Sequence, residues 1–152
     1  MILTFRQADD SDYELAFQAK KQAMGPHITV KWGWDEAYQR SIHNRRWHEK
    51  PWFVLMMGET SVGTLSLLRQ DSILRFGEFY LLDEYRNRGL GTQVLQSVLD
   101  ECDQNGEVVI LEYLKWNPVG SLYKRFGFKV THENDVHYFL RREPLKAVVS
   151  SS

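Results

Sequence analysis

One stretch of the sequence decides the fold: Leu81-Leu82-Asp83-Glu84-Tyr85-Arg86-Asn87-Arg88-Gly89-Leu90-Gly91-Thr92. The residues before it are typical of a strand, and after it apolar residues recur every three or four positions, as on one face of a helix. The first turn of a helix leaves four N–H groups without partners and carries partial positive charge. Glycines remove the Cβ atoms that would keep an anion away from these amides, and Arg86 and Arg88 add full charges. The stretch therefore predicts a phosphate or pyrophosphate site.

Two alternatives to a phosphate site remain open at this turn. The glycines can simply relieve crowding between strand and helix while the arginines are solvated. Gly89 and Gly91 can also open a dinucleotide-binding fingerprint, in which Glu112, at the end of the next strand, would bind the ribose. Against the fingerprint, Val94 occupies the third glycine position and the sequence pattern contains one β-α-β unit. A P-loop is excluded because no Gly-Lys-Ser/Thr follows.

Outward from the turn, the periodicity predicts the order β-α-α-β-β-β-α-β-α-β-β. Strands are predicted over residues 2–6, 52–57, 62–68, 73–82, 108–113, 128–131 and 136–141, and helices over 12–24, 36–48, 89–105 and 118–126. A capping box of Ser11 and Glu14 would start the first helix, and Gly25-Pro26 would end it. The fourth and fifth strands bracket a helix, so a right-handed crossover makes them parallel. The predicted fold class is a mixed α/β sheet with helices on both faces.

Composition narrows the function classes. The chain has 152 residues, about one domain's length, with 43% hydrophobic and 26% charged residues. A net charge of −1 argues against a nucleic-acid or anionic-membrane partner, and no apolar run approaches the roughly 18 residues of a membrane helix. The one cysteine, Cys102, excludes a disulfide framework, and the histidines show no metal-site spacing. We expect a single cytoplasmic domain over residues 1–142, a C-terminal tail over 143–152, and no metal.

A second informative segment follows the fifth strand. It reads Asn117-Pro118-Val119-Gly120-Ser121-Leu122-Tyr123-Lys124-Arg125-Phe126-Gly127-Phe128. Asn117 followed by Pro118 is a helix start, with proline at the position where a missing N–H costs nothing. Tyr123 falls in the second turn of that helix. Taken alone, it is a packing residue whose hydroxyl reaches the surface.

Together the two segments resemble the GNAT superfamily of acetyl-CoA-dependent N-acetyltransferases. The resemblance rests on Arg86-x-x-Gly89-x-Gly91 at a strand-to-helix turn, followed by Asn117-x-x-x-x-Leu122-Tyr123-x-x-x-Gly127-Phe128. It spans about residues 2–142, and the predicted order of elements is similar to that fold. The resemblance implies that the parallel strands 4 and 5 splay apart, and that a primary amine attacks acetyl-CoA directly in a ternary complex. It also allows a homodimer.

By matching position, the resemblance implies roles for individual residues. The coenzyme A pyrophosphate would be held at the turn by Arg86, Asn87, Arg88, Gly89, Leu90, Gly91 and Thr92. The backbone from Phe79 through Leu81 to Leu82 would pair with the pantetheine arm like an extra strand. The Leu81 amide would bond the thioester oxygen, Asn117 would touch the pantetheine, and Tyr123 would protonate the departing thiolate.

The chemistry of acyl transfer agrees with these roles. A fixed N–H aimed at the developing oxyanion lowers the barrier by about 3–4 kcal/mol, and a positioned acid contributes roughly 10²–10⁴-fold. The general base matches least well. Some family members place a glutamate in the middle of strand 4, near the position of Arg75 in this chain, and alternation puts Glu78 on the opposite face from Arg75. Glu78 is retained as a candidate base, with further candidates Glu112, His137, Asp35 and Glu36.

The acceptor region is predicted between the first two helices. Trp32 and Trp34 would either contact a substrate amine through their rings or seal the lower core. The sequence leaves the acceptor open among an amino acid, a polyamine, an aminoglycoside-like drug, and a protein N-terminus or lysine. Two rival functions belong to other classes: a non-catalytic acyl-CoA-binding module, and a dinucleotide-binding redox protein.

Overall fold

The computed structural model describes residues 3–145. By its internal contacts the chain divides into two compact units. Among the described residues, the first unit comprises residues 3–68 and 76–91, and the second comprises residues 69–75 and 92–145. The predicted strand residue Ile2 and the part of the predicted tail over 146–152 lie outside the described residues. The boundary of a single domain at residue 142 stays a prediction.

Seven strands form one hydrogen-bonded sheet in the order β1-β2-β3-β4-β5-β7-β6. The strands are β1 (Leu3–Gln7), β2 (Trp52–Met57), β3 (Thr60–Gln70), β4 (Ile73–Leu81), β5 (Val108–Leu114), β6 (Lys129–Glu133) and β7 (His137–Arg142). The β4–β5 pair is parallel, with the register Ile73 to Val108, Leu74 to Val109 and Arg75 to Ile110. The pairs β1–β2, β2–β3, β5–β7 and β6–β7 are antiparallel. This arrangement confirms the predicted mixed α/β sheet and the parallel fourth and fifth strands.

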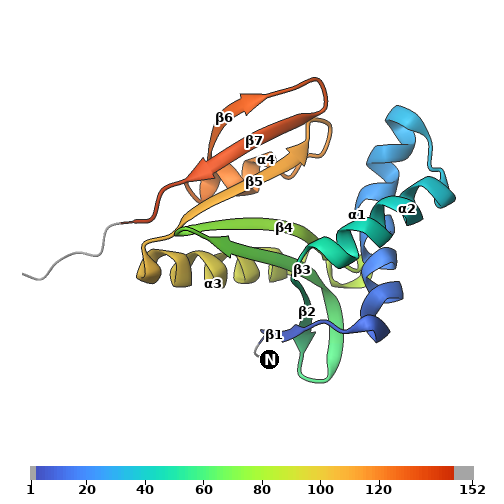
Figure 1. Cartoon of the computed structure of the whole chain (residues 1–152), viewed down its shortest axis with the longest axis horizontal. Coiled ribbons are helices and arrows are strands. Elements are labelled where there is room, and N and C mark those ends of the chain that lie inside the picture. Colours follow the sequence, from blue (N-terminus) through green and yellow to red (C-terminus); the bar gives the residue numbers. More distant parts are fainter. Residues whose placement is uncertain (1–2, 146–152) are drawn as a thin grey trace, which may run out of the picture. The chain divides into compact units, whose positions relative to one another are not determined.

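The four helices follow the predicted order. They are α1 (Tyr13–Trp32), α2 (Glu36–Glu49), α3 (Leu90–Asn105) and α4 (Gly120–Arg125), and two short 3₁₀ turns cover η1 (Asp10–Asp12) and η2 (Asp83–Tyr85). The Asp35 side chain accepts a hydrogen bond from the Tyr38 N–H, 3.0 Å away, and so caps α2 as its sequence suggests. Helices α1 and α2 meet in the first unit (Figure 1), where the Arg40 guanidinium on α2 binds the Glu14 carboxylate on α1.

The predicted end of the first helix at Gly25-Pro26 is wrong. Helix α1 continues through Pro26 to Trp32, and Gly33, with φ of 76°, ends it in the left-handed region. Proline removes one helical hydrogen bond, and its ring normally clashes with the Cβ of the preceding residue. Gly25 has no Cβ, so this second cost is absent. Burial of Met24 and Ile28 on either side of the proline then favours a continuous helix.

The predicted capping box is also wrong. Asp9, not Ser11, is the cap, and it precedes the 3₁₀ turn η1. Its carboxylate accepts from the Ser11 N–H, while the Asp12 carboxylate accepts from the Asp9 N–H at 2.9 Å. The Arg6 guanidinium donates to both carboxylate oxygens of Asp12, from Nη1 at 2.9 Å and from Nη2 at 2.8 Å. Because this fork fixes Asp12 before the helix begins, the cap lies two residues earlier than expected.

The second unit confirms the helical stripe that begins after the glycines. Its members on α3 that fall in this unit are buried, namely Val94, Leu95, Val98, Leu99 and Cys102. Helix α3 ends at Asn105, as the predicted range 89–105 has it, and Gly106 follows with φ of 69°. Helix α4 begins later than predicted, at Gly120, because Asn117 Oδ1 accepts from the Val119 N–H, 3.2 Å away, and closes a turn before the helix. Figure 1 shows the β6–β7 hairpin that completes this unit.

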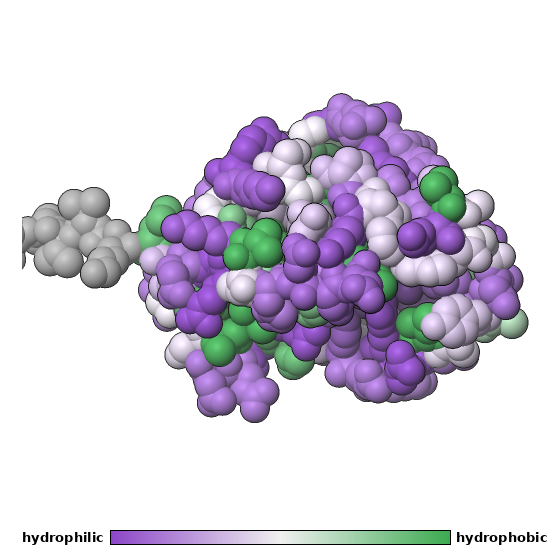
Figure 2. Space-filling view, turned by 90° about the horizontal axis from the view of Figure 1, so that it is seen from above, coloured by the Kyte–Doolittle hydropathy of each residue, from purple (hydrophilic) through white to green (hydrophobic). Residues whose placement is uncertain are grey.

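One face of the molecule is mostly polar. The face drawn in Figure 2 is largely hydrophilic, with apolar residues in small separate areas. Within the described part of the chain, each helix is too short or too polar to cross a membrane. The cytoplasmic location stays a prediction.

A buried ion pair fastens the last strand of the second unit. Arg142, at 5% exposure, binds both carboxylate oxygens of Asp103 at 2.8 and 3.0 Å and donates from Nε to the Phe126 carbonyl at 2.8 Å.

Arg142→Met would leave these acceptors without their donors, and we expect it to lower the free energy of unfolding by about 3 kcal/mol. The neighbouring Arg141 is exposed and pairs with Glu143. Arg141→Met should cost less than about 1 kcal/mol. Urea unfolding of both variants checks the difference, and equal losses would contradict it.

Candidate functional site

The turn between β4 and α3 has the backbone geometry of an anion site. Asn87 and Gly89 are both left-handed, with φ of 60° and 77°. A Cβ added at Gly89 would meet no heavy atom of the described residues within 4 Å, so the backbone is open there. The Asp83 N–H donates to Gln22 Oε1 at 2.8 Å, which anchors the turn to α1. Left-handed residues in such a turn let several amides face one anion.

Two N–H donor groups of the Arg86 side chain lack a hydrogen-bond partner among the described residues. Its Nη2 lies 2.7 Å from Asp83 Oδ1 as an ion pair. The buried Nε and Nη2 nevertheless make no well-oriented hydrogen bond within the described part of the chain. The side chain as a whole is 34% exposed, but a buried N–H group such as that of Nε favours an acceptor that can bond it. An anionic ligand at this turn supplies such an acceptor, so the residues present fit a pyrophosphate group.

The remaining turn residues predicted from sequence differ in exposure. Asn87, Arg88 and Thr92 are exposed, and the Arg88 guanidinium lies 5.7 Å from the centre of the Tyr85 ring. Leu90 is buried, so only its backbone can contact a ligand. A Cβ on Gly91 would lie 3.8 Å from the Phe79 ring, which is an ordinary contact. The glycine at position 89 is therefore the one that the backbone conformation itself requires.

The end of β4 is shaped by a close approach from β3. A Cβ on Gly63 would lie 2.3 Å from the Tyr80 carbonyl oxygen and 3.1 Å from Leu81 Cα. The Thr64 hydroxyl donates to the Glu78 carbonyl at 3.0 Å, and Glu78 itself is left-handed, with φ of 48°. These features mark an irregular point in the strand, of the kind that re-aims backbone groups near active sites. Gly63 and Thr64 thus fix the backbone that presents Leu81.

The backbone of Leu82, which the sequence predicts to pair with the pantetheine arm, already forms hydrogen bonds within the protein. The Leu82 N–H donates to the Val62 carbonyl at 2.9 Å, and the Leu82 carbonyl accepts from the Tyr85 N–H at 2.9 Å. The Leu82 N–H is therefore committed to the protein. Phe79 and Leu81 are both half-buried, and their pairing with a ligand stays a prediction.

Glu78 lies at the centre of a buried polar cluster formed by Lys20, His43, Arg46, Lys50 and Glu78. Its side chain is 3% exposed. Oε1 accepts from Lys50 Nζ at 2.9 Å and from Arg46 Nη1 at 3.4 Å. Oε2 has no hydrogen-bond partner among the described residues. One carboxylate oxygen is therefore held by cations and the other is open.

Charge–charge interactions set the protonation of this polar cluster. Burial alone would raise the pKa of Glu78, but Lys50, Arg46 and Lys20 outweigh it and hold that pKa below its usual value. Burial, and then repulsion from Arg46, lowers the pKa of Lys20 to about 8, although Glu78 offsets part of this. Burial also lowers the pKa of His43, whose Nε2 lies 3.1 Å from the Tyr13 carbonyl. Glu78 is therefore ionised at neutral pH.

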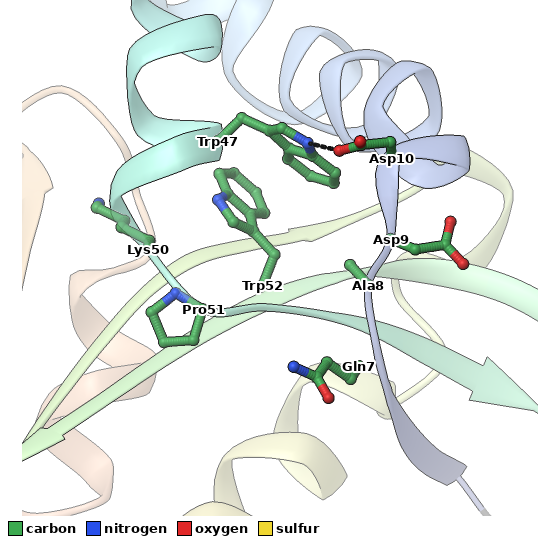
Figure 3. Close-up of a pocket in the computed structure, with 8 residues that line it drawn as sticks. All are labelled: Gln7, Ala8, Asp9, Asp10, Trp47, Lys50, Pro51 and Trp52. Atoms are coloured by element: carbon green, nitrogen blue, oxygen red, sulfur yellow. Dashed lines mark hydrogen bonds between the residues drawn. The ribbon is translucent and has the colours of Figure 1, made fainter.

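A cavity of about 180 Å³ opens beside the polar cluster (Figure 3). It is lined by Gln7, Ala8, Asp9, Asp10, Trp47, Lys50, Pro51 and Trp52. Asp10 accepts from Trp47 Nε1 at 3.3 Å, and Asp9 caps the following turn. In Figure 3 the Lys50 ammonium points away from the cavity, and it is bonded to Glu78 instead. The carboxylates of the cavity are already occupied, so the polar cluster is the better candidate for binding.

The second predicted segment lies in the second unit. Asn117 uses its Oδ1 to hold the turn before α4, and Tyr123 is buried on α4 at 7% exposure. Burial, with a smaller contribution from Tyr113, raises the pKa of the Tyr123 phenol above its usual value. Tyr113 also accounts for Gly120, because a Cβ there would lie 2.2 Å from the Tyr113 hydroxyl oxygen. Tyr123 is thus a protonated phenol at neutral pH.

The two predicted acceptor tryptophans have different environments. Trp32 ends α1 and is 55% exposed, so it does not seal a core. Trp34 is half-buried, packs edge-on to Phe17 at 6.2 Å between ring centres, and donates from Nε1 to Glu36 at 2.6 Å. The other candidate bases have partners too, since Glu112 binds Arg75 at 2.9 Å and Asp35 caps α2.

Sequence reasoning missed the residues that surround Glu78 and shape β4. Gly63 had a readable signal, because an isolated glycine inside an apolar strand indicates a bulge or a close backbone approach. Lys20 also had one, since it interrupts the buried positions Ala16, Met24 and Ile28 at helical spacing. Arg46 and Lys50 had no signal of their own. Within residues 3–145, no three His, Cys, Asp or Glu side chains gather as a metal site would require.

A family model matches the sequence, and solved structures share its fold. The sequence model of the acetyltransferase (GNAT) domain matches residues 48–130. The search of curated proteins found no match. Among solved structures, the PaiA N-acetyltransferase of Thermoplasma acidophilum in complex with coenzyme A is similar, with a TM-score of 0.75 and 17% identity over 94% of this chain and 99% of that one. The ribosomal-protein-S18-alanine N-acetyltransferase of Escherichia coli has a TM-score of 0.68 and 14% identity over 99% of each chain. A GNAT-family acetyltransferase of Staphylococcus aureus Mu50 has a TM-score of 0.69 and 18% identity, over 95% and 100%.

The burial of Lys20 leads to a stability prediction. The folded protein carries a penalty for a protonated ammonium whose pKa is lowered to about 8, so Lys20→Met should raise the free energy of unfolding at pH 7. Between that pKa and the ordinary value of 10.5, the unfolded chain holds a proton that the folded protein has released. Wild-type stability therefore rises with pH across this window, and the gain from Lys20→Met shrinks.

Urea unfolding at pH 7 and pH 10 measures this effect. Lys21→Met is the matched control, because Lys21 is the next residue on α1, is 42% exposed and pairs with Glu36. The control should show no gain at pH 7. A loss of stability in Lys20→Met at pH 7 would contradict the expectation.

Proposed function

Because the chain belongs to the GNAT family of acetyltransferases, we propose that it transfers an acetyl group from acetyl-CoA to a primary amine. The observation that carries the proposal is the family match over residues 48–130, since these include both the turn after β4 and the segment from Asn117 to Tyr123. The fold supports it, because the similar Thermoplasma acidophilum structure contains coenzyme A. The rival dinucleotide function has no such support, and its proposed ribose ligand Glu112 is paired with Arg75.

Acetyl-CoA supplies an activated acetyl thioester. The open N–H groups of Arg86 and the amides between Asn87 and Thr92 would hold its pyrophosphate, with Gly89 leaving the backbone exposed. The backbone of Phe79 and Leu81 would pair with the pantetheine arm. Asn117 would contact the same arm. These assignments follow the family pattern, and the unsatisfied Arg86 donors are the feature of this chain that favours them.

The reaction needs three tasks from the protein. As the amine nitrogen bonds to the acetyl carbon, the Leu81 N–H would stabilise the negative charge on the carbonyl oxygen. As the carbon–sulfur bond breaks, the Tyr123 phenol would give its proton to the thiolate. The Tyr123 phenol is protonated at neutral pH, although burial raises its pKa and so makes it a weaker acid than a solvent-exposed tyrosine. Tyr123 then regains a proton from solvent before the next turnover.

The third task is removal of the amine's proton. Glu78 is the proposed group, because its Oε2 is an open acceptor on an ionised carboxylate. An alkyl ammonium has a pKa near 10, far above that of a carboxylate that cations hold low. Glu78 therefore orients the ammonium and passes its proton to solvent rather than storing it.

Thiol release tests the function directly. Purified protein is mixed with acetyl-CoA and a panel of primary amines, and free thiol is followed with a colorimetric reagent, with amine-free reactions as the control for hydrolysis. Amine-dependent release, together with mass-spectrometric detection of an acetylated amine, would support the proposal. Binding of coenzyme A without turnover of any amine would favour an acyl-CoA-binding module instead.

Gly89 gives a binding prediction with an internal control. Gly89 and Gly106 stand at opposite ends of α3 with similar left-handed φ values, and neither would bring a Cβ within 4 Å of another described residue. The two Gly→Ala substitutions should therefore lose similar stability, roughly 1 kcal/mol. Gly89→Ala should weaken coenzyme A binding at least about tenfold, because the Cβ and the altered backbone disturb the amides that face the pyrophosphate. Calorimetric titration measures both variants, and equal affinities would remove Gly89 from the site.

Tyr123 gives a kinetic prediction. Tyr123→Phe should lower kcat by about 10²-fold, because the thiolate loses its proton donor, while coenzyme A affinity changes little. Tyr138→Phe is the control, since Tyr138 also belongs to the tyrosine group of the second unit, 5.6 Å from the Tyr113 ring centre. Steady-state kinetics with coenzyme A titrations separate the two effects. A wild-type kcat in Tyr123→Phe would exclude it as the acid.

A further inference from the structure

The inner face of α2 is polar where a helix of a small domain is normally apolar. Gln39 and His43 are its buried residues, and Arg46 and Lys50 follow at spacings of three and four. Gln39, His43 and Arg46 share one side of the helix, and Lys50 is the residue that caps its C-terminal end. Amphipathic helices place their apolar side against the core, so this inward polar side departs from the usual pattern. Such departures are expected at functional sites rather than at purely structural ones.

Helix α1 adds a further buried cation to the same region. Lys20 is 5% exposed and lies between the buried Phe17 and Met24 at helical spacing. Its pKa responds to Arg46, Glu78 and Lys50, so the four charged groups interact. Arg46 and Lys50 thus bind one oxygen of the Glu78 carboxylate, and the buried Lys20 adds a third positive charge to the region. Excess positive charge in a buried site destabilises the protein unless an anion joins it.

The charged side chains of this region differ in their exposure to solvent. The side chains of Arg46 and Lys50 are 36% and 26% exposed, whereas Glu78 is 3% exposed. A small molecule can therefore reach the two outer cations from solvent. Glu78 Oε2 is itself buried and has no hydrogen-bond partner among the described residues. The cluster presents positive charge and a single acceptor oxygen side by side.

We propose that the polar cluster binds an acceptor amine that also carries a carboxylate, as in an amino acid, with the amine at Glu78 Oε2 and the carboxylate on Lys20, Arg46 and Lys50. The assignment rests on the proposed acetyltransferase function and names its substrate class. The carboxylate supplies the anion that the three cations lack. The ammonium supplies the donor that Oε2 lacks. A polyamine satisfies only the second requirement and adds further positive charge to a site already rich in it.

The test uses acceptors that differ only in the charged group. Acetylation rates are measured for an α-amino acid, for its carboxamide and for the corresponding amine without the carboxyl group. A polyamine and an amine bearing a phosphate complete the panel. The amino acid should show a kcat/KM at least about tenfold above its carboxamide, because the lost interactions are hydrogen bonds between charged groups. Higher kcat/KM for the carboxamide, the polyamine or the phosphate-bearing amine would overturn the proposal.

Variants locate the effect in the polar cluster. Lys20→Met should reduce the preference for the amino acid over its carboxamide by about tenfold, mainly through KM. Lys21→Met, on the outside of α1, should keep the wild-type preference. Because Lys20→Met is expected to be more stable than wild type at pH 7, a lost preference in a variant that unfolds at the same or a higher urea concentration is a result that a structural role would not give. Should Lys20→Met fail to fold, Lys50→Gln tests the same preference from α2.

The outcomes separate this inference from the proposed function. Calorimetry with coenzyme A and thermal unfolding with each acceptor are run on the same preparations. If coenzyme A does not bind and no amine is acetylated, the proposed function fails and the inference fails with it. If coenzyme A binds and amines are acetylated without regard to a carboxylate, only the inference fails. Stabilisation of the coenzyme A complex by the amino acid and not by its carboxamide supports both.

Discussion

The buried carboxylate of Glu78 is the interaction on which the proposed acceptor site depends. A lone carboxylate at 3% exposure would be neutralised by protonation, but cations from α1 and α2 keep it charged. Those cations come from residues 20, 46 and 50, so folding of the helices is tied to the chemistry of β4. Thr64 and Gly63 fix the strand at the same point, one through a hydrogen bond to the Glu78 carbonyl and the other by leaving room for the Tyr80 carbonyl. The charge and the backbone geometry are therefore set together.

This polar interior has a cost that a purely structural helix pair would avoid. Lys20 occupies a position where an apolar residue would pack without desolvating a charge, and its lowered pKa reports the penalty. Replacing buried ionic groups with well-packed apolar ones is often neutral or stabilising. The presence of Lys20, Arg46 and Lys50 near one glutamate is therefore easier to understand as a binding feature than as a source of stability. In contrast, the Arg142–Asp103 pair of the second unit satisfies its donors and acceptors within the protein and needs no ligand.

The sequence predicted the elements that local patterns control. The strand, glycine turn and helix around Gly89 were readable because each depends on residues next to it, and the mixed sheet followed from their order. The prediction failed at Pro26, where the missing Cβ of Gly25 and the burial of Met24 and Ile28 override the usual stop signal. It failed at the first cap because Arg6, three residues before Asp9, holds Asp12 in place. The polar cluster could not be predicted, since its members are far apart in sequence and only the fold brings them to Glu78.

The groups proposed to bind the coenzyme and those proposed to bind the acceptor depend on the sequence in different ways. The groups proposed to hold the coenzyme lie in short local motifs, which a family can share at low sequence identity. The groups proposed to hold the acceptor are single side chains on two helices and one strand, and each can change without altering the fold. Similar solved structures with 14–18% identity therefore establish the fold and leave the acceptor to the residues of this chain. Here those residues place three cations and one open carboxylate oxygen together, and a zwitterionic amine has the charges to match them.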